Sequence, residues 1–153
     1  MATALCLTSR PLHPPATPAG SFSPKPDIIL FNEGTNDGAN NIVAPMTVVL
    51  NNLLTACPGT PIVVLEPFNG AEAANLQAAI ANSTSPSTIH YLSTQGFYDT
   101  QFGGALHPTG PNDIGKVAPQ IANAVRPILM KAFVDARAVS AEEEELIKQR
   151  RRQ

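Results

Sequence analysis

The sequence predicts an α/β fold with a small parallel sheet. Residues 28–31, Ile-Ile-Leu-Phe, form an apolar run without alternation, which is typical of a strand covered on both faces. Residues 61–67 and 88–92 are two further strand-like runs. Helix-like segments lie between these runs and after the last one. This order favours parallel strands joined by right-handed crossovers, in a sheet smaller than the usual five or six strands.

Length and composition limit the classes of protein to consider. A chain of 153 residues that is 43% hydrophobic is long enough for one domain with a core. The net charge of −2 and the lack of a basic face argue against a nucleic-acid partner. Cys6 and Cys57 show no metal-ligand spacing and predict no disulfide framework. No apolar run approaches the roughly 20 residues that a membrane-spanning helix needs.

The first 26 residues differ in composition from the remainder. They contain no acidic residue and six prolines, which is typical of a disordered leader; a transit-like peptide is the alternative. We therefore expect a leader at 1–26, the α/β domain at 27–134 and a charged carboxyl-terminal helix at 135–153.

Three segments have helical periodicity. Residues 42–56 carry apolar side chains at helical spacing and end before Pro58-Gly59, and residues 71–81 form a short alanine-rich helix. The third helix covers residues 111–134, where Pro119 and Pro127 are expected to kink or divide it.

The tail has the features of a solvated helix. Ser140 and Glu143 form a capping box, and basic residues near the end complement the helix dipole. A nuclear or nucleic-acid signal at residues 150–152 is the less favoured alternative.

Polar residues follow the first and third strands. FNEGTNDG at 31–38 comes directly after the first strand, and GGALHPTG at 103–110 lies between the third strand and the last helix. Both should lie at the carboxyl edge of the sheet, where open α/β sheets bind ligands. His107 is a residue type that exchanges a proton near neutral pH, and the amide of Asn36 can donate hydrogen bonds to an oxyanion. Together they predict acyl transfer.

These two motifs resemble conserved blocks of the SGNH hydrolases, the GDSL-type lipases and esterases. Gly34-Thr35-Asn36-Asp37 is similar to the third block and Leu106-His107-Pro108 to the fifth, and the resemblance covers about residues 26–129. It implies a flavodoxin-like three-layer α/β/α fold, no cofactor or metal, and hydrolysis of small acyl esters, with acetylated carbohydrates as one candidate class. It also implies Asn36 as oxyanion-hole donor, His107 as general base, and Gly34 and Asp37 as supporting residues.

The chain also departs from that family. The family's nucleophile lies in a Gly-Asp-Ser segment upstream of the tetrad, and the residues before Gly34 contain no such segment. The upstream serines, none of which leads from an apolar strand into a helix, are Ser9, Ser21 and Ser23. Gly104 stands where the family has the aspartate that orients the histidine, and Asp99 or Asp113 could substitute. The nucleophile is therefore unassigned, and the domain looks amino-terminally truncated.

Two functions remain open at this point. One is an ester hydrolase, and the other is a non-catalytic SGNH remnant with at most a binding role. Simple turn chemistry at residues 36–38 and a carboxylate pair of Glu33 and Glu66 are less favoured alternatives. His13 and His90 are interpreted as structural or incidental.

Overall fold

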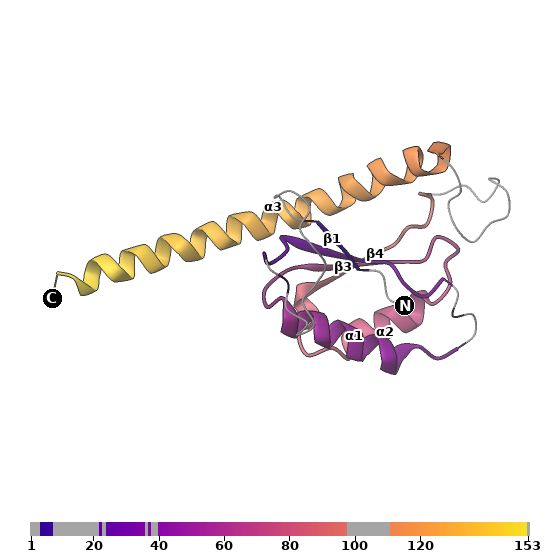
Figure 1. Ribbon diagram of the computed structural model, residues 1–153, viewed down its shortest axis with the longest axis horizontal. Coiled ribbons are helices and arrows are strands. Elements are labelled where there is room, and N and C mark those ends of the chain that lie inside the picture. The colour runs from indigo at the N-terminus through magenta and orange to yellow at the C-terminus, as the bar shows by residue number, and fades with distance from the viewer. Residues whose placement is uncertain are drawn as a thin grey trace.

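The computed structural model describes residues 4–7, 22, 24–35, 37, 40–97 and 111–152, with 4–7 and 111–114 described by their backbone. Four strands form one sheet in the order β1-β2-β3-β4 (Figure 1). Their bounds are Ala4–Leu7, Ile28–Phe31, Ile62–Leu65 and Ile89–Leu92. β2, β3 and β4 are parallel, whereas β1 runs antiparallel to β2. The predicted α/β class is confirmed by this parallel sheet and its helices.

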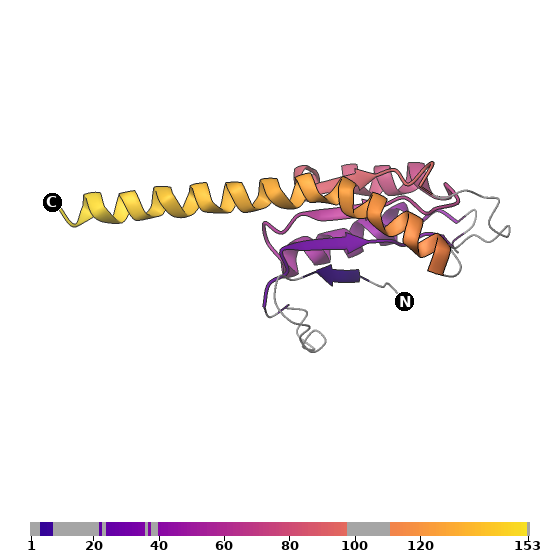
Figure 2. The same ribbon diagram turned by 90° about the horizontal axis from the view of Figure 1, so that it is seen from above.

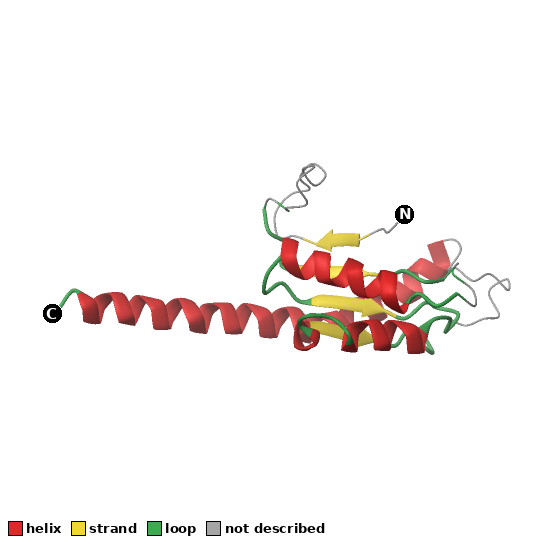
Figure 3. Ribbon diagram, turned by 90° about the horizontal axis from the view of Figure 1, so that it is seen from below, coloured by secondary structure: helices red, strands yellow, loops and turns green. Residues whose placement is uncertain are grey.

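Helices cover both faces of the sheet. α1 (Val43–Ala56) and α2 (Ala73–Ala81) pack on one face, and α3 (Pro111–Arg150) crosses the other. Figure 1 shows α3 above the strands with α1 and α2 below them, and Figure 3 shows the two short helices in front of the sheet. A short 3-10 helix, Pro86–Thr88, leads into β4. The described residues thus form three layers.

The register aligns the carboxyl ends of the parallel strands. Phe31 of β2 lies beside Val64 of β3, and Leu65 of β3 lies beside Leu92 of β4. The segments that leave these three strands therefore start at one edge of the sheet. This is the edge at which parallel sheets leave a crevice for ligands.

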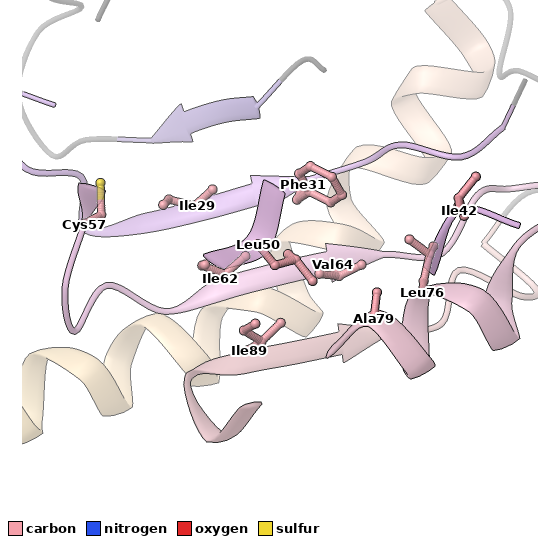
Figure 4. Close-up of a cluster of buried hydrophobic side chains, with 10 residues drawn as sticks. All are labelled: Ile29, Phe31, Ile42, Leu50, Cys57, Ile62, Val64, Leu76, Ala79 and Ile89. Carbon is pink, nitrogen blue, oxygen red and sulfur yellow. The ribbon is translucent and has the colours of Figure 1, made fainter. Parts of the chain in front are cut away.

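Two apolar cores lie on the two sides of the sheet. Side chains alternate along a strand, so Ile29 and Phe31 face α1 and α2 while Ile28 and Leu30 face α3. All four are buried, as the apolar run without alternation predicted. Figure 4 shows the larger cluster, made of Ile29, Phe31, Ile42, Leu50, Cys57, Ile62, Val64, Leu76, Ala79 and Ile89.

The structure differs from expectation at both ends of the chain. Residues 4–7, within the expected leader, form β1 and pair with all of β2. At the other end, neither Pro119 nor Pro127 ends the helix, and Ser140 lies within α3 instead of starting a new helix. Both prolines are on the exposed side of α3, where water can bond the carbonyls that they leave without an amide donor. The apolar stripe of α3 packs on the sheet and holds the helix across them.

No helix in the described part of the chain is both long and apolar enough to span a membrane.

Candidate functional site at the carboxyl edge of the sheet

The stretch after β2 turns sharply at Gly34. This glycine has a φ of 105°, a backbone angle that residues other than glycine rarely adopt. The backbone N–H of Asp37 donates to the carbonyl of Gly34 at 3.3 Å, which closes a turn over residues 34–37. The side-chain amide of Asn40 donates to the carbonyl of Asp37 at 2.5 Å. Gly34 and Asp37 thus lie on a tight turn at the carboxyl edge.

Gly34 is buried against the start of α2. A Cβ at Gly34 would lie 3.3 Å from the Cβ of Glu72 and 3.5 Å from Cδ1 of Ile42. Glu72 itself has a positive φ of 61°, and its Oε2 accepts a hydrogen bond of 2.5 Å from the amide of Asn75. Only glycine therefore allows the chain after β2 to approach α2 this closely.

A buried carboxylate organises the ends of the other two strands. Glu66 follows β3 directly and is 5% exposed. Its Oε2 accepts a hydrogen bond of 2.5 Å from the hydroxyl of Ser93, and its Oε1 accepts one of 2.7 Å from the amide of Gln95. Its backbone carbonyl accepts a third, of 3.0 Å, from Thr94. Three consecutive residues after β4 are therefore held by the residue that follows β3, and the donors of Ser93 and Gln95 offset the cost of burying the carboxylate.

Two buried polar atoms near this edge lack hydrogen-bond partners among the described residues. They are the hydroxyl of Tyr91 and the side-chain nitrogen of Asn32. Burial is the main cause that raises the pKa of Tyr91; Gln77 lowers it in part, and the nearby Glu66 carboxylate raises it. Neither Glu66 nor Gln77 is placed to make a good hydrogen bond with this hydroxyl.

A hydrogen bond links α3 to the residues that follow β4. Residues 98–110 begin after Phe97, and α3 follows at Pro111. The side-chain amide of Gln120 in α3 donates to the carbonyl of Phe97 at 3.0 Å. This bond joins α3 to the chain that follows β4, at the carboxyl edge of the sheet.

The structure places some of the predicted site residues. Gly34 and Asp37 lie at the carboxyl edge, as expected from the strand order. The residues of interest that lie outside the described part are Ser9, His13, Ser21, Ser23, Asn36, Asp99, Gly104 and His107. Asp113 falls in the first turn of α3, where the backbone alone is described.

His90 is remote from this edge. It lies in β4 with its side chain toward α3, in a groove at the amino edge that Pro61, Ile128 and Lys131 also line. Partial burial and, to a smaller extent, the positive charge of Lys131 lower its pKa. This position agrees with the structural interpretation of His90.

Sequence reasoning noted Glu66 at a strand tip but missed its partners. The available signal was the polar run Ser93-Thr94-Gln95 directly after the third strand, on the neighbouring parallel strand. Within the described ranges, no three His, Cys, Asp or Glu side chains gather as they do in a metal centre. No family model matches the chain, and neither does a curated protein or a solved structure.

Proposed function

We propose that the carboxyl edge of the sheet is an SGNH-type site for the hydrolysis of small acyl esters, on a flavodoxin-like three-layer fold. In this proposal the amide of Asn36 donates to the oxyanion that forms when the ester carbonyl is attacked. His107 accepts the proton of the attacking hydroxyl and returns it to the leaving alcohol. Gly34 and Asp37 shape the turn that presents Asn36.

One observation carries the proposal. The tetrad turn after β2 and the segment 98–110 after β4 start from level ends of parallel strands, and Gln120 holds Phe97 to α3 at that same edge. A general base and an oxyanion donor must act on one carbonyl group, so their segments have to meet on one side of the sheet. This topology supports that meeting.

A second candidate function, binding without catalysis, is favoured by the strand beside β2. β1 runs antiparallel, so its last residue, Leu7, lies beside Ile28 at the amino edge. The strand therefore does not lead toward the tetrad, and Ala4–Leu7 contains no serine. Among the described serines, only Ser93 follows the carboxyl end of a strand, and its hydroxyl is held by Glu66.

The test is turnover of p-nitrophenyl acetate by the purified 153-residue chain beside its His107→Ala variant. Circular dichroism shows whether both proteins are folded. We expect the wild type to exceed the variant by roughly a hundredfold, the usual size of a general-base contribution. A matched His90→Ala variant should keep the wild-type rate because His90 lies at the opposite edge.

Equal rates for wild type and His107→Ala, both near the buffer rate, would reject hydrolysis by this chain and leave the binding function. If turnover depends on His107, the variant Ser93→Ala tests the serine at the carboxyl edge, and Ser87→Ala, beside His90 in the groove at the amino edge, is its control. Loss of turnover in Ser93→Ala alone would identify the edge serine. Retention in both would direct the search to the other serines of the chain.

A further inference from the structure

The second half of α3 extends beyond the sheet. Figure 2 shows the helix crossing the strands and continuing to the carboxyl end without a neighbouring element. Two large apolar side chains on this part, Leu146 and Ile147, are 55% and 51% exposed. Water contact at both is unfavourable unless another surface covers them.

Glu143 and Arg150 flank this apolar pair on the same side of the helix. At 3.6 residues per turn, positions 143, 146, 147 and 150 fall within an arc of about 100°. The same four residues line one shallow hollow on the helix surface. We call them the terminal face of α3. Read along the chain, this face is acidic, apolar, apolar and basic.

No ion pair among the described residues uses the charges of the terminal face. The ion pairs that the described residues of α3 make are Lys131 with Asp135, at 2.6 Å, and Lys148 with Glu145, at 3.8 Å. Glu143 and Arg150 are exposed and take part in neither pair. They are seven positions apart, about 10 Å along the helix axis, which is too far for a direct bond between them.

We propose that the terminal face is a self-association surface that pairs antiparallel with the same face of a second copy of this chain. In the opposite direction the same face reads basic, apolar, apolar and acidic. An antiparallel copy therefore places a basic residue opposite each acidic one and an apolar residue opposite each apolar one. In the pair, Glu143 of each copy lies opposite Arg150 of the other, and Leu146 lies against Ile147. A twofold axis passes between positions 146 and 147, so the interface is isologous and closes as a dimer.

Charge complementarity selects this occupant and this direction. A parallel pairing of two copies would place Glu143 on Glu143 and Arg150 on Arg150, which is repulsive at both ends. The surface is well below the standard interface of about 1,600 Å², so the dimer is weak. We expect a dissociation constant on the order of 0.1 to 1 mM, which corresponds to a small interaction free energy.

The test is sedimentation equilibrium of the full chain and its charge variants over a concentration series that brackets the expected constant. Glu143→Arg and Arg150→Glu each turn two attractive contacts into two repulsive ones, so each should weaken the dimer by about tenfold. The double variant, Glu143→Arg with Arg150→Glu, keeps the net charge of the wild type and should restore the dimer. A mixture of the two single variants should form heterodimers, because their faces are complementary again.

Glu144→Arg is the matched control. It changes the net charge as much as Glu143→Arg does, but residue 144 points away from the terminal face, so the dimer should persist. A monomer at every concentration would overturn the proposal, and any partner of the terminal face would then be a different protein. Failure of the double variant to restore the dimer would overturn it as well, since restoration depends on the antiparallel pairing. Circular dichroism of each variant verifies that α3 stays helical.

Discussion

The hydroxyl of Ser93 donates a hydrogen bond of 2.5 Å to Oε2 of Glu66 and so joins the ends of β4 and β3. This contact spans neighbouring parallel strands at the edge where their chains leave the sheet. Glu66 is buried, whereas Ser93 and Gln95 are exposed, so the donors reach the buried carboxylate from the surface. The direction in which the chain leaves β4 therefore depends on one carboxylate.

Glu66→Ala should be among the more destabilising single substitutions in the chain. It leaves the hydroxyl of Ser93 and the amide of Gln95 without their acceptors and opens a space at the end of β3. We expect a loss of about 2 to 4 kcal/mol in the free energy of unfolding. Urea denaturation followed by circular dichroism measures it.

Ser93→Ala removes one donor and should cost about 1 kcal/mol, because Gln95 still donates a hydrogen bond to the buried carboxylate. Glu144→Ala is the control for loss of a carboxylate, since Glu144 is exposed on α3 and should change stability by less than about 0.5 kcal/mol. Equal losses for Glu66→Ala and Glu144→Ala would show that the Glu66 contacts do not stabilise the fold.

Gly34→Ala and Gly96→Ala separate backbone strain from close contact. Both glycines have a positive φ, but a Cβ at Gly96 meets nothing within 4 Å, whereas one at Gly34 lies 3.3 Å from Cβ of Glu72. We expect a loss of about 1 kcal/mol for Gly96→Ala and of about 2 to 3 kcal/mol for Gly34→Ala. Thermal or urea unfolding compares the two, and an equal loss would mean that α2 moves aside at no cost.

His90 predicts a pH dependence of stability. Burial and Lys131 lower its pKa in the folded state, so the unfolded chain binds the proton more readily. As the pH falls through the ordinary histidine value of about 6.5, the unfolded state is protonated first and the fold loses stability. The loss stops once the pH is below the lowered pKa of the folded state.

The measurement is urea unfolding at pH 7.5 and pH 5.5 for wild type and His90→Gln, in which this proton site is absent. The wild type should lose more stability between the two pH values than the variant does. An equal loss of stability in both proteins would assign the pH dependence to other groups.

Lys131→Gln should raise the pKa of His90, which an NMR titration of the imidazole detects.

Tyr91→Phe should leave stability unchanged or raise it by up to about 1 kcal/mol. The hydroxyl of Tyr91 is buried without a hydrogen-bond partner among the described residues, so its removal relieves an uncompensated desolvation cost. Tyr91 packs against the larger core, and phenylalanine retains that packing. A loss greater than 1 kcal/mol would show that the hydroxyl bonds Glu66 or Gln77 in solution.

The parallel strands were predictable because their sequence carries a strong local signal. Residues 28–31 are apolar on both faces, and the structure buries all of them between α3 and the pair α1 and α2. The order of strands and helices then fixed the shared carboxyl edge before any side-chain contact was known. Gly34 and Asp37 were placed at that edge for the same reason.

Other features depend on contacts between distant parts of the chain. Nothing in Ala4–Leu7 alone indicates that it pairs antiparallel with β2, because such pairing is set by the free edge of β2. Helix propensity predicts a break at Pro119 and Pro127, but packing on the sheet overrides it. The links from Glu66 to Ser93 and Gln95 join residues 27 and 29 positions apart, so the polar run after the third strand shows the donors but not their acceptor.

The continuity of α3 implies that one helix has two local stabilities. Its first half is held by the sheet through residues such as Val125 and Ile128, and its second half has only its own backbone bonds. Opening of a helix end requires no unfolding of the domain, so amide hydrogens beyond about residue 140 should exchange with solvent far faster than those near residue 125. Pairing of two terminal faces would slow that exchange at the free end alone.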